Sequence, residues 1–413
     1  MSNNAANPAP SIPLINVKTA QHLGYLNYEF IELTNAQKRL TGRQALTPII
    51  DLSDYSTKAV IDWIDIRVLL NRKTQFQWLQ GDIEKIIGRK VHVENSLGRA
   101  QANDPDEKFV IRFQEPDIKS LRAIFALINT NYGLGLDPLI CGIEITVDFY
   151  PKTPGELERA KMVRVLTNHI LFKRDIITDH RDRPRSVWGT GRGRYQRLLA
   201  GNPNFSEAAN KRLLIETEWD HAPYSDATIN IGDIEADVRW RIMDKTIDTQ
   251  NRDAGTFKAL VEKDKRARVE VTLTGDALSE ICPMYFQELT QLNFTRLQAR
   301  YFSFVLPTVS GKVVHQKRWR QAVAVARDRQ RIAKFRKTGG IGLKAMDDAV
   351  AETQKIIRRQ SLSDMHNRGL KLPAKKRIAM GASQTFVAYE ELNERVLTAL
   401  RSLGERVRKG FLK

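Results

Sequence analysis

The residues with the clearest chemical potential are carboxylates within residues 138–150, a segment dominated by strand-forming side chains. Glu144 and Asp148 alternate there with isoleucine and valine, so a strand would place both carboxylates on one face. A third carboxylate, Glu270, lies within residues 267–273, which we expect to form a neighbouring strand. Three converging carboxylates suit a hard divalent ion, Mg²⁺ or Mn²⁺, which prefers oxygen ligands and can polarise a phosphodiester. The alternative is three solvated side chains on the open face of an antiparallel sheet.

A group of basic residues accompanies these carboxylates in the sequence. Residues 226–245 are predicted to form a hairpin around a turn at 231–233, and the arginines of its second strand alternate with apolar residues. Both arginines therefore point to one side, and guanidinium groups suit phosphate oxygens. The alternative role is cross-strand ion pairing with Glu270 or Asp244. The predicted phosphate contacts are Arg239, Arg241, Lys245 and Arg268.

Residues 189–197 form a glycine- and arginine-rich stretch inside a longer segment, 173–225, that is expected to be loop-rich. The stretch lacks the Lys-Ser or Lys-Thr pair of a Walker loop, and no strand precedes it as in dinucleotide-binding folds. Flexible amides, arginines and aromatic rings fit single-stranded DNA through charge and stacking, and a merely flexible linker is the alternative. The residues concerned are Trp188, Arg192, Arg194, Tyr195 and Arg197.

Positive charge is concentrated in the last quarter of the chain. Residues 311–413 hold 25 Lys and Arg against 9 Asp and Glu, a net of +16, whereas the other 310 residues hold only +2 of the total +18. An anionic polymer is the natural partner of such a region, because each neutralised phosphate releases counterions. A solvated basic helix without a specific partner is the alternative. The predicted DNA contacts on a helix over residues 312–337 are Lys317, Arg318, Arg320, Arg327, Arg331, Lys334 and Arg336.

Composition argues against several other classes of protein. No run of about 18 apolar residues occurs, so no membrane span is expected, and residues 1–13 lack the basic and apolar regions of a secretory signal. Two cysteines cannot build a disulfide framework or a cysteine zinc site, and the 7 histidines show no metal-ligand spacing. We therefore expect a cytoplasmic protein without a membrane partner.

The elements that must position these residues alternate between strands and helices. A period of two predicts strands, and a period of 3.6 predicts helices whose apolar residues face a core. The order predicts an α+β fold, with an antiparallel-rich sheet and helices packed on one face. The expected strands are 59–70, 91–94, 108–113, 138–150, the hairpin 226–245 and 267–273, and the expected helices are 74–88, 117–132 and 153–172.

We expect three regions along the chain. Residues 1–57 are predicted to be a polar, proline-broken tail with an irregular or helical lead-in. Residues 58–305 are predicted to form the α+β body, with residues 173–225 as a loop insertion. Residues 306–413 are predicted to be a basic helical region that binds DNA.

The C-terminal region is predicted to contain several separate helices. Gly339-Gly340 is expected to stop the first of them, and further helices are expected over 343–359 and 361–370. Ser383 is expected to cap a last helix, whose apolar stripe begins at Phe386. That helix would dock either on the body or on a second copy of the chain, so a homodimer is one expectation.

Three short segments occur in a fixed order along the predicted body. They are Gly142-Ile-Glu-Ile-Thr-Val-Asp148, Arg241-Ile-Met-Asp-Lys245 and Arg268-Val-Glu270. This order resembles the replication-initiator family of rolling-circle plasmids, filamentous phages and conjugative transposons, whose relatives include relaxases. The catalytic domain of that family shows a strand similar to Arg-Ile-Asp-Leu-Ala-Val-Asp, a hairpin ending in Arg-Ile-Tyr-Asp-Lys, and a strand similar to Arg-Val-Glu. The resemblance spans roughly residues 59–300, and the order and spacing of the segments carry it.

The resemblance implies a protein that nicks one DNA strand at an origin, with a tyrosine, a divalent metal and bound single-stranded DNA. Carried over by position, Asp148 and Glu270 would be metal ligands or their supports, and Glu144 would be a third ligand. Arg241 and Lys245 would be phosphate contacts.

The position of the family tyrosine departs from the pattern in this chain. It holds Met243, whose side chain has no hydroxyl and cannot attack phosphorus. If nicking persists, another tyrosine must supply the nucleophile. The candidates, in order of preference, are Tyr224, Tyr195 and Tyr150.

These features favour a DNA-binding replication initiator of a mobile element that nicks or grips single-stranded origin DNA at a carboxylate metal site. Its basic C-terminal helices would recognise duplex origin DNA, and a host helicase is a further partner consistent with the resemblance. One alternative is a non-catalytic DNA-binding regulator with the same fold. Another is an RNA-binding or nucleoprotein-scaffolding protein that uses the same positive charge.

Overall fold

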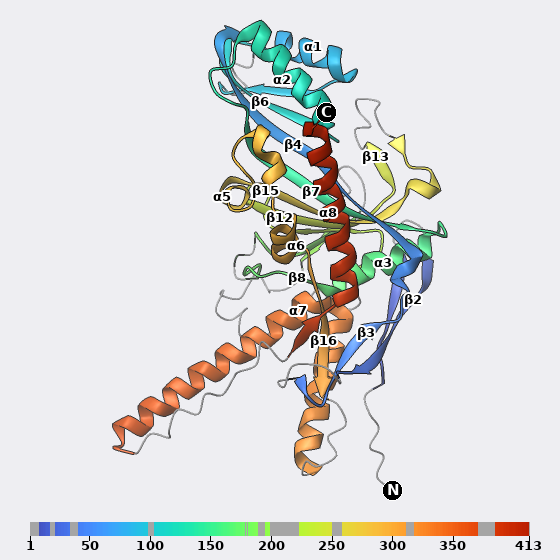
Figure 1. Ribbon diagram of the computed structural model, residues 1–413. Helices are drawn as coiled ribbons and strands as arrows, with labels where there is room; N and C mark the ends of the chain where they lie inside the picture. The colour runs from blue at the N-terminus through green and yellow to red at the C-terminus, as the bar shows by residue number, and fades with distance from the viewer. Residues whose placement is uncertain are drawn as a thin grey trace.

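A nine-stranded antiparallel sheet forms the centre of the molecule (Figure 1). The computed structural model describes residues 8–16, 21–33, 40–97, 103–177, 179, 181–188, 195–198, 223–249, 258–310, 318–370 and 385–412. The strand order across the sheet is β10 (Tyr195–Leu198), β9 (Arg185–Trp188), β11 (Thr228–Ile231), β12 (Val238–Lys245), β15 (Arg266–Thr274), β7 (Leu139–Pro151), β4 (Tyr55–Thr74), β6 (Asp106–Gln114) and β5 (His92–Asn95).

The central strands are buried on both faces, although their sequences alternate between apolar and polar residues. On β7, Ile145 and Val147 are fully buried, and so are Glu144 and Asp148 on the opposite face. The register between β4 and β7 shifts between Ile61 and Trp63, which leaves Asp62 as an extra residue in β4. This bulge is held by a hydrogen bond from the Glu115 amide to the Asp62 carbonyl, 2.6 Å long.

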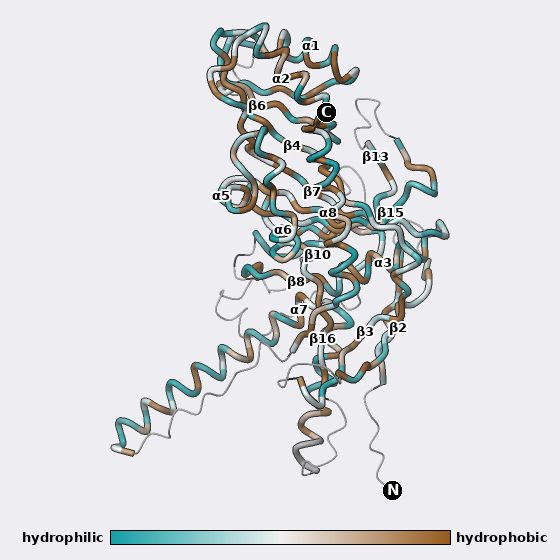
Figure 2. Tube along the Cα trace, viewed as in Figure 1, coloured by the Kyte–Doolittle hydropathy of each residue, from teal (hydrophilic) through white to brown (hydrophobic). Residues whose placement is uncertain are grey.

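Helices cover the apolar face of the sheet, and the expected α+β fold with helices on one face is confirmed. Against this face Trp240 donates its indole N–H to the Tyr301 carbonyl (3.0 Å), and Arg406 donates to the Ala59 carbonyl. Figure 2 shows the hydrophobic stretches gathered along the central strands and the helices that face them. The covering helices are α2 (Ile118–Tyr132), α3 (Glu156–His169), α6 (Phe294–Tyr301) and α8 (Glu390–Leu412), while α1 (Phe76–Ile87) packs on α2.

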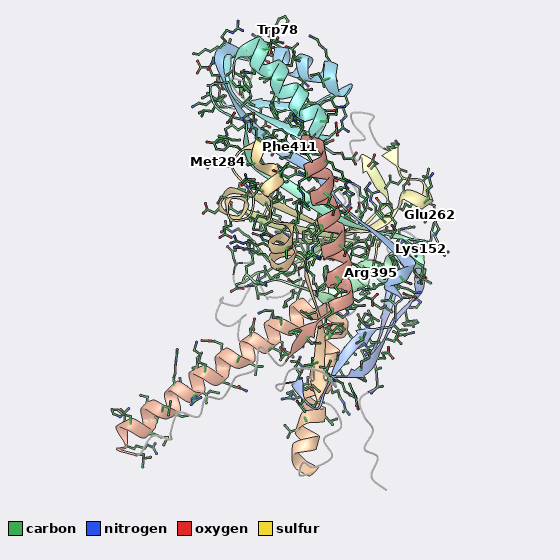
Figure 3. The ribbon with its side chains drawn as sticks, in the orientation of Figure 1. Trp78, Lys152, Glu262, Met284, Arg395 and Phe411 are labelled. Carbon is green, nitrogen blue, oxygen red and sulfur yellow. The ribbon has the colours of Figure 1, made fainter. Side chains whose placement is uncertain are left out.

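Helix α8 runs along the central strands from the neighbourhood of β16 to that of α2 (Figures 1 and 3). At its far end Phe411 packs on Phe286, with ring centroids 5.2 Å apart, and its carbonyl accepts a hydrogen bond from Arg122 on α2 (2.8 Å). None of the helices in the described ranges, α8 included, combines the length and apolar character needed to cross a membrane. The described contacts thus place the last helix on the body of the same chain.

A second sheet joins the N-terminal segment to the C-terminal region. The expectation of an irregular or helical lead-in within residues 1–57 is wrong, because buried residues such as Ile12, Leu14, Leu26 and Tyr28 alternate as in strands. Its strand order is β1 (Ser11–Asn16), β2 (Gln21–Glu32), β3 (Arg43–Pro48), β16 (Ser303–Ser310) and β17 (Phe386–Ala388), with β8 (Ile170–Leu171) also paired to β16.

The start of the last helix also differs from the prediction. Phe386 lies in β17 rather than in the helix, because its backbone pairs with Pro307 of β16, and α8 begins only at Glu390. The expected cap, Ser383, lies outside the described residues. Residues 386–388 therefore pair with the edge of the sheet as a strand, although their spacing fits the helix that follows.

The loop-rich prediction for residues 173–225 is only partly tested. Residues 185–188 and 195–198 form β9 and β10, which extend the central sheet by two antiparallel strands. Residues 178, 180, 189–194 and 199–222 lie outside the described part of the chain, and so do Arg192 and Arg194. A separate two-stranded sheet, β13 (Ile247–Thr249) with β14 (Lys258–Ala259), follows β12.

Helix α7 (Arg318–Asn367) is bent at Gly339, whose φ of 64° and ψ of −162° interrupt the helical backbone. Beyond the bend one helix runs through Asn367, so the separate helices expected over 343–359 and 361–370 form a single element. Figure 1 shows this second half projecting away from the body. The first half packs against the body through Ile332 and Phe335, which are buried.

Replacing Gly339 with alanine is expected to destabilise the protein by about 2–4 kcal/mol. A Cβ atom there would lie 2.7 Å from the Cα of Asn168 on α3, and the positive φ adds backbone strain. Urea denaturation of the variant measures the loss. Gly369→Ala is the matched control, because Gly369 has a similar φ of 67° but no heavy atom within 4 Å. An equal loss at both positions would show that the close approach to α3 contributes nothing.

Candidate metal and phosphate site

The strand register brings the three sequence segments side by side on β12, β15 and β7. Arg241 lies opposite Glu270, and Met243 lies opposite Arg268, which in turn lies opposite Asp148. These side chains occupy the face of the central sheet that is turned away from the helices. We call it the polar face, and its residues include Asp62, Glu144, Asp148, Arg239, Arg241, Met243, Lys245, Arg266, Arg268 and Glu270.

Three carboxylates on the polar face form a compact group, which we call the acidic triad. One oxygen from each of Asp62, Glu144 and Glu270 lies within 4.8 Å of the other two. The side chains of Glu144 and Glu270 are buried, whereas that of Asp62 is 25% exposed. An all-oxygen donor set with one exposed member fits a hard divalent ion that enters from solvent.

Asp148 lies close to the triad but is not a member of it. Its two oxygens accept hydrogen bonds from Arg268, Nε at 2.5 Å and Nη2 at 2.7 Å, and Arg266 Nε lies 3.0 Å away. Asp148 therefore anchors the two arginine side chains, and its oxygens do not belong to the group of carboxylate oxygens that lie within 4.8 Å of one another. The sequence therefore identified two members of the triad, Glu144 and Glu270, and missed Asp62.

The Arg268 side chain contacts both Asp148 and the acidic triad. Its side chain is 1% exposed, and its Nη1 donates to Asp62 Oδ1 (2.9 Å) and to Glu270 Oε1 (3.2 Å). Burial lowers the pKa of Arg268, but the surrounding Asp148, Glu270 and Asp62 outweigh burial and raise it above the ordinary value. Arg268 is therefore a permanently charged, inward-facing support rather than a contact for an incoming phosphate.

Glu144 has the most perturbed carboxyl group of the triad. Burial and the nearby Glu270 raise its pKa to about 7, partly opposed by Arg241 and by the hydroxyl of Thr272, which donates to Glu144 Oε2 at 2.6 Å. Near neutral pH the group thus exchanges a proton readily. A bound cation would favour its ionised form, so metal affinity and protonation are linked at this position.

Arg241 contacts two carboxylates of the triad and balances part of their negative charge. Its Nε donates to Glu270 Oε2, and its Nη2 lies 3.6 Å from Glu144 Oε1. Burial lowers the pKa of Arg241, and the two glutamates raise it to a net value above the ordinary one. The cross-strand pairing that was an alternative in the sequence thus occurs for Arg241. Its side chain is 43% exposed, so it has room to rotate into solvent.

Two cations on the polar face lack such partners. Within the described part of the chain, the side chains of Arg239 and Lys245 form no hydrogen bond or ion pair, and Arg239 Nε is buried without an acceptor. Burial is the main cause that lowers the pKa of each, and the positive charge of Arg268 adds to it at Lys245. An anion beside these groups would supply the missing acceptors, as a phosphate does.

The three candidate nucleophiles lie in different parts of the structure. Tyr150 is on the polar face, but its hydroxyl faces Asp148 Oδ2 (3.4 Å), and burial with Asp148 raises its pKa to about 12. Tyr224 precedes β11 and packs on Trp188, with ring centroids 5.3 Å apart. Tyr195 lies on β10, three strands from β12, and its side chain is outside the described residues.

Met243, the position at which the resemblance predicts a tyrosine, lies on the polar face. Met243 is 8% exposed on the polar face, opposite Arg268 in the register. A side chain at this position therefore reaches the immediate surroundings of the triad, but the thioether supplies no nucleophile for phosphorus.

The basic residues predicted on the C-terminal helix have different environments. Arg331 is 5% exposed and ion-paired with Asp347, so it stabilises the bend of α7 internally. Arg327 and Arg336 are exposed, and Lys334 is half-buried. Of the remaining predicted DNA contacts, Lys317 lies outside the described residues, and only the backbone is described for Arg197, Arg318 and Arg320.

No protein-family model matches this chain, and no curated protein matches it. The functional interpretation therefore depends on the geometry of the polar face.

Proposed function

We propose that this protein is a DNA-binding replication initiator of a mobile element, which holds single-stranded origin DNA against the polar face and nicks it with a divalent ion. The observation that carries the proposal is the acidic triad, Asp62, Glu144 and Glu270, with Arg239 and Lys245 beside it on the same face. Oxygen ligands next to unpartnered cations are the combination that phosphodiester chemistry requires.

Each residue has a distinct part in the proposed reaction. The triad binds Mg²⁺ or Mn²⁺, which would polarise the phosphodiester and stabilise the charge that develops on its oxygens. Arg239 and Lys245 bind the non-bridging oxygens of the same or the adjacent phosphate. A tyrosine hydroxyl would attack phosphorus and release the 3′-hydroxyl of the preceding nucleotide, so the DNA 5′-phosphate becomes joined to the protein.

Arg241 must leave the triad for an ion to enter it. The guanidinium and the ion compete for the same oxygens of Glu270 and Glu144, and the exposed stem of Arg241 permits a turn toward solvent. Once displaced, the guanidinium is free to bind a DNA phosphate that arrives together with the ion. Ion and DNA would then bind cooperatively, because each one stabilises the displaced position of Arg241.

The exposed Arg327 and Arg336 on the first half of α7 support a second contact with DNA. Arg327 hydrogen-bonds Ser310 Oγ at 3.0 Å but keeps 58% of its side chain exposed. These residues would bind the phosphates of duplex origin DNA, while the polar face holds the single strand. A host helicase and a second copy of the chain are further partners consistent with such a role.

A non-catalytic DNA-binding regulator is the second candidate, and Met243 favours it. The residue that faces the triad from β12 carries no hydroxyl, and the Tyr150 hydroxyl is directed at Asp148 instead. In this case the ion would strengthen DNA binding without any strand cleavage.

The test incubates the full chain and Mn²⁺ with end-labelled single-stranded and supercoiled DNA that carry the flanking sequence of its own gene. A denaturing gel detects nicks and protein-linked label, and mass spectrometry identifies the modified residue. We expect a tyrosyl adduct, with Asp62→Asn and Glu270→Gln each slowing its formation at least about 100-fold. Glu94→Gln, an exposed carboxylate on β5 of the same sheet, is the matched control and should leave the rate unchanged.

Two other outcomes decide between the candidates. Metal-dependent DNA binding with neither nick nor adduct would favour the regulator and make Met243 the residue that marks the lost activity. No preference for the flanking DNA over random duplex at physiological salt would remove both candidates.

A further inference from the structure

A planar stack of Trp63 and Arg112 lies on the polar face, beyond the acidic triad. The guanidinium carbon of Arg112 is 4.2 Å from the centroid of the Trp63 ring. Asp65 holds the guanidinium with two hydrogen bonds, from Nε to Oδ1 and from Nη2 to Oδ2, each 2.7 Å long. The guanidinium is therefore held along one edge by the aspartate, and its central carbon lies over the indole ring.

The Arg112 side chain of this stack is partly open to solvent. It is 42% exposed, whereas its ion-pair partner Asp65 is only 13% exposed. Surface arginines rarely keep one orientation, because each rotatable bond gains entropy in solvent. Here the bidentate pair and the ring restrict Arg112 before any ligand arrives, which lowers the entropy lost on binding a flat partner.

The stack is placed next to the triad by the sheet itself. Trp63 lies opposite Glu144 in the register of β4 with β7, and it directly follows Asp62 in the chain. Gly142 makes room for the ring, because a Cβ atom at that position would lie 3.1 Å from Trp63 Cζ3. Arg112 lies on β6, two strands from β7, which is about 10 Å at the usual strand spacing.

A hollow of about 450 Å³ adjoins Arg112. Arg112, Arg89 and Lys90 line it together with Glu115, Asp117 and residues of α1 and α2, so its wall carries both positive and negative charge. Arg89 donates to the Gln114 carbonyl, which fixes the rim at the end of β6. A flat ligand on Arg112 would thus have basic groups available for an attached phosphate.

We propose that Trp63 and Arg112 form a base-stacking platform for single-stranded nucleic acid. One nucleobase lies on the Arg112 guanidinium, an adjoining phosphate lies toward Arg89 and Lys90, and the strand passes the acidic triad. The platform rests on the proposed function of the polar face and adds a base contact to its phosphate contacts. The platform would determine which nucleotide lies at the ion, because a short oligonucleotide is long enough to reach from the platform to the acidic triad.

The test compares a labelled oligothymidylate with an abasic polymer of equal length, by fluorescence anisotropy with the full chain. Stacking contributes about 1–3 kcal/mol per base, so the wild-type protein should bind the base-containing strand at least about 5-fold more tightly. Arg112→Lys keeps the charge without the planar group and should remove this preference while affinity for the abasic polymer persists. Arg112→Ala should also remove it.

The matched control is Arg67→Ala, because Arg67 is an exposed arginine on β4 that has no part in the stack. It should weaken binding of both polymers equally and leave the preference for bases intact. Equal affinity of the wild-type protein for both polymers would overturn the platform and leave the phosphate contacts standing. Failure to bind either polymer would overturn the proposed function together with the platform.

Discussion

Replacing Arg268 with methionine is expected to destabilise the protein by about 3–5 kcal/mol, the largest effect predicted for a single polar side chain here. Methionine fills much of the same volume but removes the one buried cation that contacts Asp148, Asp62 and Glu270 together. Asp148 is 1% exposed, so its charge cannot be solvated by a small movement. Urea denaturation at neutral pH, followed by tryptophan fluorescence and circular dichroism, measures the loss of free energy of unfolding.

The control for this prediction is Arg112→Met on the same face of the sheet. Arg112 also pairs with an aspartate through two hydrogen bonds, but at a half-exposed position, where an ion pair contributes about 1 kcal/mol or less. Comparing the loss of stability in the two variants therefore separates the effect of burial from the effect of ion pairing. A loss at Arg268 as small as the loss at Arg112 would mean that the buried network relaxes or admits water when its cation is removed.

Replacing Glu144 with glutamine is expected to stabilise the metal-free protein at pH 8 and to abolish its stabilisation by Mn²⁺. The folded state raises the Glu144 pKa from 4.5 to about 7, so folding favours the protonated form. Stability of the wild-type protein should consequently fall as pH rises between about 4.5 and about 7, because the folded state binds the proton more tightly than the unfolded state. Glutamine mimics the neutral form at every pH.

Denaturation of both proteins at pH 5 and pH 8, with and without Mn²⁺, checks this prediction. At pH 8 the metal-free variant should be more stable than the wild-type protein by on the order of 2 kcal/mol, and at pH 5 the difference should shrink to about 1 kcal/mol or less. Mn²⁺ should raise the stability of the wild-type protein more at pH 8 than at pH 6, because a proton competes for Glu144. Glu94→Gln should reproduce none of these changes, and the same Mn²⁺ response in Glu144→Gln would exclude Glu144 as a ligand.

Much of the central architecture can be predicted from the sequence, because its signals are local. Strand β7 alternates isoleucine and valine with Glu144 and Asp148, and α2 begins at the N-cap residue Asp117 and ends at Gly133. The order of these elements predicts an antiparallel-rich sheet with helices on one face, and that prediction is confirmed. Two of the three triad carboxylates follow from the same alternation.

The rest depends on pairings between distant segments. Asp62 joins the triad only because a bulge in β4 turns it toward Arg268, and a bulge depends on the neighbouring strand. Arg112 is 47 residues from Asp65 in the chain, so no local pattern predicts their pair. Asp148 satisfied every local criterion for a ligand, yet Arg268 and Arg266 occupy its oxygens.

The second sheet has a consequence for how the chain acquires its structure. β16 pairs with β3 near the beginning of the chain and with β17 near its end, and Arg406 of α8 bonds the Ala59 carbonyl across 347 residues. During synthesis the edge of β3 stays unpaired until β16 has been made. We therefore expect slow completion of folding, in which a chaperone that shields strand edges raises the yield of native protein.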